Sequence, residues 1–72
     1  MRQIILQHKM DLHWLREVHL KDCEPLPFFV LAVLHGSEDC PQQIDLYATN
    51  DIRTKPTVYL YDSATDSYRK KD

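Results

Sequence analysis

The longest apolar run of this chain predicts the centre of its fold. Seven apolar residues follow one another without interruption from Phe28 to Leu34, after Pro27 and before His35-Gly36. The run is far shorter than the roughly 20 residues that cross a bilayer. Its Phe and Val content and its flanking Pro and Gly favour a strand over a buried helix. Because no polar residue alternates with the apolar ones, we expect a strand in the middle of a sheet that is covered on both faces.

Shorter apolar stretches predict the neighbouring strands. Ile44, Leu46 and Ala48 alternate with polar residues, which is typical of a strand with one wet face. Charges in residues 67–71, the most C-terminal of the expected strands, discourage further pairing, so we expect an edge strand there. The other expected strands are residues 2–7, 58–62 and 67–71.

Turn residues between the last two expected strands set their register. Ser63 to Asp66 have turn chemistry. An even-length loop centred on Ala64-Thr65 would place Tyr61 opposite Tyr68 and Tyr59 opposite Lys70.

A helical period replaces the strand pattern between residues 11 and 21. At 100° per residue, Trp14, Leu15 and Val18 fall on one side of a helix, whereas Leu20 falls among polar residues on the other side. We therefore expect one helix with the Trp14-Leu15-Val18 side against the sheet.

These elements predict a single α+β domain covering residues 1–72. One helix packs on a small, mainly antiparallel sheet of three to five strands, in the order β-α-β-β-β-β. Hydrophobic residues make up 43% and charged residues 28% of the chain, as in folded globular proteins. A domain of 72 residues is marginal, because such chains bury only about 60% of their unfolded surface.

Composition excludes several function classes. The formal net charge of −2 gives no general reason to bind nucleic acid or an anionic membrane. Gly36 is the only glycine, which excludes phosphate loops, dinucleotide fingerprints and nucleophile elbows, and we expect no cofactor. The N-terminus has no signal-peptide pattern and the chain has two cysteines, so we expect a cytoplasmic protein with reduced thiols.

Two His–Cys pairs suggest a metal site at first sight. His19 and Cys23 precede the central run, and His35 and Cys40 follow it. Neutral imidazole and thiolate are good zinc ligands. A seven-residue strand between the pairs would separate them by over about 20 Å, at about 3.3 Å per residue. We therefore expect neither a metal site nor a Cys23–Cys40 disulfide.

Histidines also raise the question of acid–base catalysis. His13 and His19 could act as general acid and base in a very small ribonuclease-like enzyme. They are six residues apart on the expected helix and would project in different directions. We therefore expect a protein that is not an enzyme. The very small ribonuclease-like enzyme is kept as a third hypothesis.

The C-terminal hairpin is the candidate binding surface. An aromatic platform with basic residues at its rim is how single-stranded nucleic acid is bound. Tyrosines on a sheet are also typical of a core or of a protein contact. The residues of this surface are Tyr59, Tyr61, Tyr68, Arg69, Lys70 and Lys71.

The leading hypothesis is a non-catalytic protein-interaction module, a regulator, inhibitor or adaptor that acts through its sheet face or edge. Single-stranded nucleic-acid binding through the tyrosine hairpin is the alternative. One short helix can cover only one face of the sheet, so the apolar residues of the other face would remain in water. We therefore expect a homodimer or a protein partner, and no membrane. The second face would carry Phe29, Leu31 and Val33, and the first Phe28, Val30, Ala32 and Leu34.

Overall fold

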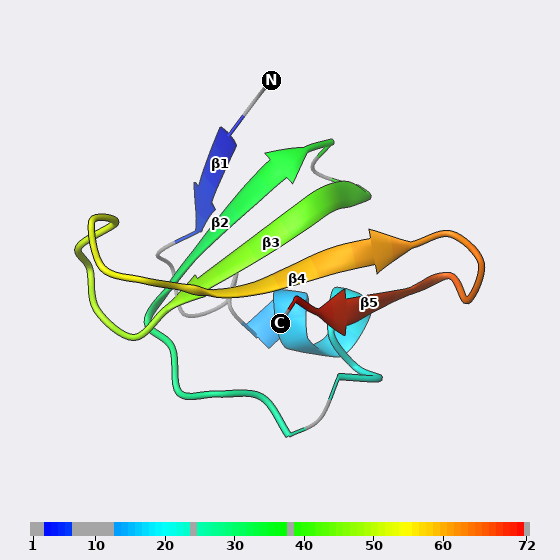
Figure 1. Ribbon diagram of the computed structural model, residues 1–72, viewed down its shortest axis with the longest axis horizontal. Coiled ribbons are helices and arrows are strands. Elements are labelled where there is room, and N and C mark those ends of the chain that lie inside the picture. The colour runs from blue at the N-terminus through cyan, green and yellow to red at the C-terminus, as the bar shows by residue number, and fades with distance from the viewer. Residues whose placement is uncertain (1–2, 7–12, 24, 38, 72) are drawn as a thin grey trace.

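The chain folds as a five-stranded antiparallel sheet whose strands lie side by side in chain order (Figure 1). The computed structural model describes residues 3–6, as backbone only, and residues 13–23, 25–37 and 39–71. The strands are β1 (Gln3–Leu6), β2 (Leu31–Gly36), β3 (Pro41–Tyr47), β4 (Thr57–Asp62) and β5 (Ser67–Lys70). The predicted antiparallel sheet is confirmed. No described helix is long and apolar enough to cross a membrane.

The central strand is displaced from its predicted position. β2 begins at Leu31, and Phe28 lies outside it with 77% of its surface exposed. At its other end β2 continues through Gly36, where the register with β3 shifts. Gly36 has φ +104°, a conformation that favours glycine, and a Cβ there would lie 3.3 Å from the Gln42 nitrogen. Gly36 is therefore the last residue of β2, and its positive φ accommodates the register shift at that end.

The predicted helix is wrong in its length and partly wrong in its inward face, since Trp14 and Leu15 do pack on the core but Val18 does not. Residues 11 and 12 lie outside the described residues, and the ordered element is a short π-helical turn, η1 (Leu15–His19). The Leu20 N–H donates to the Leu15 oxygen at 3.0 Å, a bond between residues five apart. This wider turn brings Leu15 and Leu20 to the same side, and both are fully buried, whereas Val18 is 51% exposed. The fold is therefore mainly β rather than α+β.

The main core lies between η1 and the first face of the sheet, the face that carries Ala32 and Leu34. Leu15 of η1 and Leu20, the residue after η1, belong to it, and Phe29 packs against it from the loop before β2. The prediction that Phe29 belongs to the second face is wrong, because residues 28–30 are not in the strand. The sheet residues of this core are Ala32, Leu34, Ile44, Leu46, Tyr59 and Tyr68.

The second face of the sheet has a smaller core. Leu31, Val33 and Tyr47 form it, and each is at most 7% exposed. The prediction that β2 is buried on both faces is therefore confirmed. The homodimer was inferred from exposure of Leu31 and Val33, which the single chain already buries; the dimer itself stays a prediction.

The register predicted for the C-terminal hairpin is confirmed. Tyr61 pairs with Tyr68, and Tyr59 pairs with Lys70. The turn between β4 and β5 uses an aspartate at each end. The Asp62 carboxylate accepts the Ala64 N–H at 3.0 Å, and Asp66 adopts φ +53°, which short polar side chains tolerate.

Candidate functional site

The tyrosines of the candidate surface differ in exposure. Tyr59 and Tyr68 are 3% and 7% exposed and belong to the main core, whereas Tyr61 is half-buried. Bases can stack only on rings that reach the solvent. Of the three tyrosines, therefore, only Tyr61 is more than 7% exposed.

Tyr68 connects three parts of the chain. Its hydroxyl donates to the Pro41 oxygen at 2.6 Å, at the start of β3. Its carbonyl oxygen accepts the Cys23 thiol at 2.9 Å, from the loop after η1. Burial raises the pKa of Tyr68, so the hydroxyl remains a donor at neutral pH. These contacts give Tyr68 a structural role.

An edge-to-face series of aromatic rings runs from the hairpin to η1. Tyr61 lies 5.4 Å from Tyr68, Tyr68 lies 5.8 Å from His19, and His19 lies 4.8 Å from Trp14, between ring centroids. The Tyr61 hydroxyl donates to Asp66 at 2.5 Å, and this bond raises the pKa of Tyr61 to about 12. The series is a packing arrangement with one end at the surface.

His19 is held within this series. Its Nε2 is buried and has no hydrogen-bond partner among the described residues. Burial lowers the pKa of His19, and the Asp39 carboxylate opposes this shift. His19 is therefore placed to remain neutral near pH 7.

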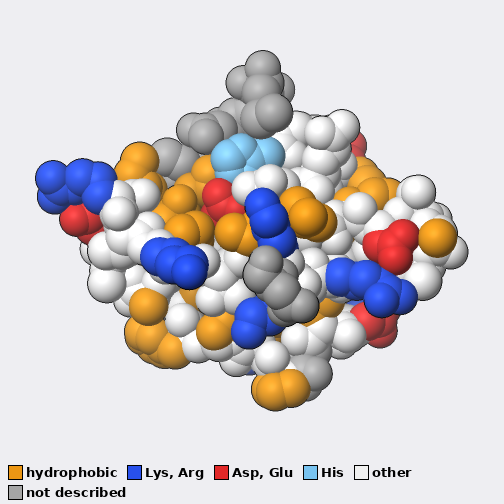
Figure 2. Space-filling model, viewed as in Figure 1, with side chains coloured by type: hydrophobic (Ala, Val, Ile, Leu, Met, Phe, Trp, Pro, Cys, Tyr) orange, Lys and Arg blue, Asp and Glu red, His pale blue; other side chains and the backbone are white. Residues whose placement is uncertain are grey.

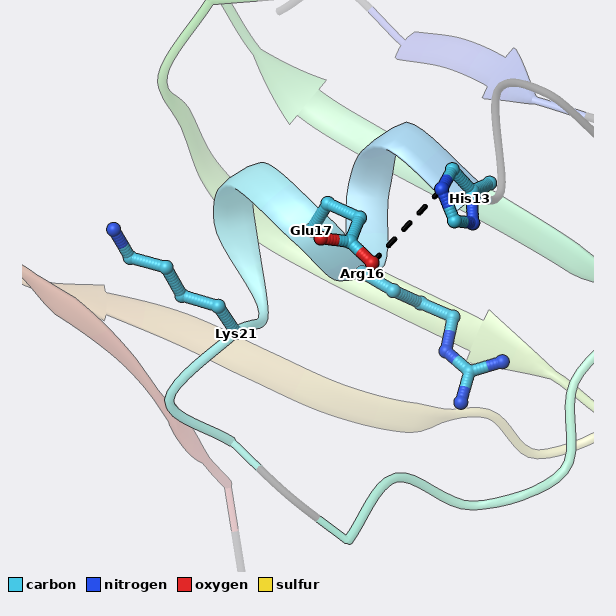
Figure 3. A pocket seen from close by; sticks show the side chains of 4 residues that line it. All are labelled: His13, Arg16, Glu17 and Lys21. Atoms are coloured by element: carbon cyan, nitrogen blue, oxygen red, sulfur yellow. Dashed lines mark ion pairs between the residues drawn. The ribbon is translucent and has the colours of Figure 1, made fainter.

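His13, by contrast, lies in a shallow depression on the surface of η1 (Figure 3). Its Nε2 is 3.9 Å from the Glu17 carboxylate, and both side chains are at least 68% exposed. Arg16 and Lys21 line the same depression and point in different directions (Figure 3). A loose, solvated ion pair of this kind has little electrostatic consequence.

The basic residues of the hairpin differ in whether a carboxylate pairs with them. Arg69 donates to the Asp62 carboxylate at 2.9 Å, so its charge is partly neutralised. Lys70 and Lys71 are exposed, and no described carboxylate lies within ion-pair distance of either. Figure 2 shows basic side chains in several separate groups on this side of the molecule, among hydrophobic and acidic ones.

A basic groove lies where β4 begins and β5 ends. Its volume is about 660 Å³, within the size range of ligand sites. Three lysines supply its charge, and Pro56 and Val58 are half-buried in its wall. None of the described residues that line it is acidic. The lining residues are Lys55, Pro56, Thr57, Val58, Lys70 and Lys71.

The outer edge of β5 is open beside this groove. The Lys71 N–H donates to the Val58 oxygen at 2.8 Å, so the backbone of Lys71 faces β4. Because successive residues of an antiparallel strand face opposite neighbours, the N–H and C=O of Lys70 point away from β4. The Tyr68 carbonyl also points outward, but the Cys23 thiol occupies it. The Cys23 thiol thus covers the edge at Tyr68, whereas no described residue bonds the outward-facing backbone of Lys70.

A polar cluster on the second face was not predicted from the sequence. His35 Nε2 lies 2.7 Å from one oxygen of Asp45, and the Gln43 amide donates to the other at 2.8 Å. Asp45 is 6% exposed. The residues lie on paired strands at alternate positions, a pattern visible in the sequence only once the β2–β3 register is known. Each oxygen of this buried carboxylate therefore has a hydrogen-bond partner.

The two cysteines share a neighbour, Tyr68, which the sequence did not suggest. Both Cys23 and Cys40 are free thiols, and both lie beside Tyr68. The premise that they stand at opposite ends of a strand is wrong, because Cys23 belongs to the loop after η1. Within the described parts of the chain, no three His, Cys, Asp or Glu side chains are grouped as metal ligands would be.

Comparisons of the chain with protein-family models, curated protein sequences and solved structures find no match.

Proposed function

We propose that this chain is a non-catalytic protein-interaction module that binds its partner through the β5 edge of its sheet. The observation that carries the proposal is the outward-facing backbone of Lys70 beside an open groove. An extended segment of a partner can add to such an edge through main-chain hydrogen bonds. A regulator, inhibitor or adaptor can work in this way without catalytic groups.

Single-stranded nucleic-acid binding has less support. That function needs exposed rings on which bases can stack, and Tyr59 and Tyr68 are in the core. The ribonuclease-like hypothesis has less support as well. A general acid and base must both reach one substrate, whereas His13 is solvated and the ring of His19 packs between Trp14 and Tyr68.

Site-specific photo-crosslinking in cells of the native source tests the proposal. A photoreactive amino acid is placed at position 71, beside the edge, and at position 16, on η1, as the control position. We expect a protein adduct from position 71 alone. A nucleic-acid adduct from position 71, or equal protein adducts from both positions, would contradict the proposal.

A pair of variants at Lys70 shows whether the backbone edge is used. Lys70→Pro removes an N–H that β4 does not use, and proline is tolerated on an edge strand when that group faces outward. Lys70→Ala removes the same side chain and keeps the N–H. We expect Lys70→Pro to abolish the adduct and Lys70→Ala to retain it, with circular dichroism confirming that both fold.

A further inference from the structure

We infer that the basic groove beside β5 binds an acidic, extended peptide segment of the partner. This inference rests on the proposed use of the β5 edge. It adds the chemistry of the partner: carboxylate side chains that alternate along a strand, placed so that they meet Lys55 and Lys71.

Charge around the groove supports an acidic occupant. Arg53 and Arg69 are paired with Asp51 and Asp62, whereas Lys55 and Lys71 have no carboxylate within ion-pair distance among the described residues. The whole chain has a formal charge of −2, so this local positive charge is opposite in sign to the average. Opposite potentials steer association and suppress wrong partners.

The nearest buried acid does not neutralise the groove. Asp45 is the cross-strand partner of Val58, which lines the groove. Its two oxygens already accept hydrogen bonds from His35 and Gln43. Among the described residues, no carboxylate forms an ion pair with the lysines of the groove.

A second copy of this chain fits the edge poorly. Two β5 strands paired across a twofold axis would bring Lys70 and Lys71 of one copy close to those of the other. Like charges directly opposite one another are destabilising in a sheet. Lysines on an edge strand also discourage self-association generally. A partner strand with carboxylates meets neither obstacle.

The shape of the groove favours a peptide over a nucleic acid. Pro56 and Val58 provide an apolar wall, and the adjacent edge provides a backbone donor and acceptor at Lys70. A peptide strand has a matching backbone, and every second side chain can contact the wall or a lysine. A nucleic acid would use the charge alone, because Tyr59 and Tyr68 are buried.

Titration of the intact chain with a peptide series tests the inference. Capped, eight-residue, Thr- and Val-rich peptides carry zero, two or four Glu at alternate positions, with Gln in place of each missing Glu. A single-stranded oligothymidine of eight nucleotides is the competing probe. Binding is measured by amide chemical-shift changes at 20 and 200 mM salt.

We expect affinity to rise with the number of Glu residues and to fall at high salt, with shifts at Thr57, Val58 and Lys70. The variant Lys55→Gln/Lys71→Gln should bind the four-Glu peptide about four- to twentyfold more weakly, because each exposed ion pair contributes about two- to fivefold. The matched control Arg16→Gln/Lys21→Gln changes the net charge equally on η1 and should bind as the parent chain does.

The outcomes separate this inference from the proposed function. Equal binding of all peptides at the β5 edge, lost in Lys70→Pro, would overturn the acidic groove and leave edge pairing intact. Tighter binding of oligothymidine than of any peptide would overturn both. Absence of binding by the four-Glu peptide at millimolar concentration, or equal loss in both double variants, would also overturn the inference.

Discussion

Truncation of Leu20 and of Val18 distinguishes the π-helical turn from a regular helix. Leu20 is fully buried in the main core, and Val18 is 51% exposed. On a regular helix the reverse is expected. Leu20→Ala removes the equivalent of three methylene groups, at about 0.8 kcal/mol each. The cavity raises the total cost to about 3 kcal/mol, within the range of about 2–5 kcal/mol for such changes.

That cost is large for a domain of this size. At about 0.05–0.15 kcal/mol per residue, a 72-residue chain has a free energy of unfolding of roughly 4–11 kcal/mol. A loss of about 3 kcal/mol should lower Tm by at least about 12 °C. Val18→Ala should change the free energy of unfolding by no more than about 0.5 kcal/mol.

Urea and thermal unfolding, followed by far-UV circular dichroism, measure both variants. Fluorescence of Trp14, the only tryptophan, provides a second probe close to the turn. If Leu20→Ala does not fold, the milder Leu20→Val should still be clearly destabilised. Equal costs for Leu20→Ala and Val18→Ala, or a cost below about 1 kcal/mol for Leu20→Ala, would refute the wide-turn packing.

Three further predictions concern pH, the central strand and assembly. Burial lowers the pKa of His19 below its ordinary value of 6.5, so its contribution to stability is complete above pH 6.5 and is lost as the pH falls below it. Between pH 7.5 and 5, His19→Gln should therefore lose less stability than the parent; an unchanged pH slope would contradict this. Leu31→Ala should cost about 2–5 kcal/mol, and Val33→Ala somewhat less because fewer methylene groups are removed, since each truncates a residue at most 4% exposed; a Tm shift of only about 2 °C, equivalent to well under 1 kcal/mol, would mean that β2 is peripheral. The predicted homodimer, which needs an interface other than the buried Leu31 and Val33, is tested by sedimentation equilibrium at micromolar concentration: twice the monomer mass of 8.6 kDa would support it, and a monomer mass would refute it.

The strands could be predicted because their signals are local. Alternation located β3, and turn residues with an even loop length set Tyr61 opposite Tyr68. The exposure of those tyrosines could not be predicted in the same way. Whether a ring on a sheet is buried depends on what covers that face, and here Leu15 of η1 and Leu20 help to cover it.

The features that were predicted wrongly or missed do not follow from a local sequence pattern. A hydrophobic period of 100° per residue cannot identify a turn closed by a bond between Leu15 and Leu20. The His35–Asp45 pair requires the β2–β3 register, which the bulge at Gly36 shifts. The basic groove lies at the two ends of the β4–β5 hairpin, residues 55–58 and residues 70 and 71; the predicted register brought these ends together, but the sequence pattern does not show a hollow between them.

The contacts of Tyr68 also determine when, during synthesis on the ribosome, the chain can finish folding. Each strand pairs with its neighbour in the chain, so hairpins can form soon after they emerge. The bonds of Tyr68 instead join residues 27 and 45 positions apart. Until β5 has been made, the main core lacks Tyr68. A nascent chain that ends before Tyr68 should therefore remain open to chaperones and proteases, and the native state should form in one late step.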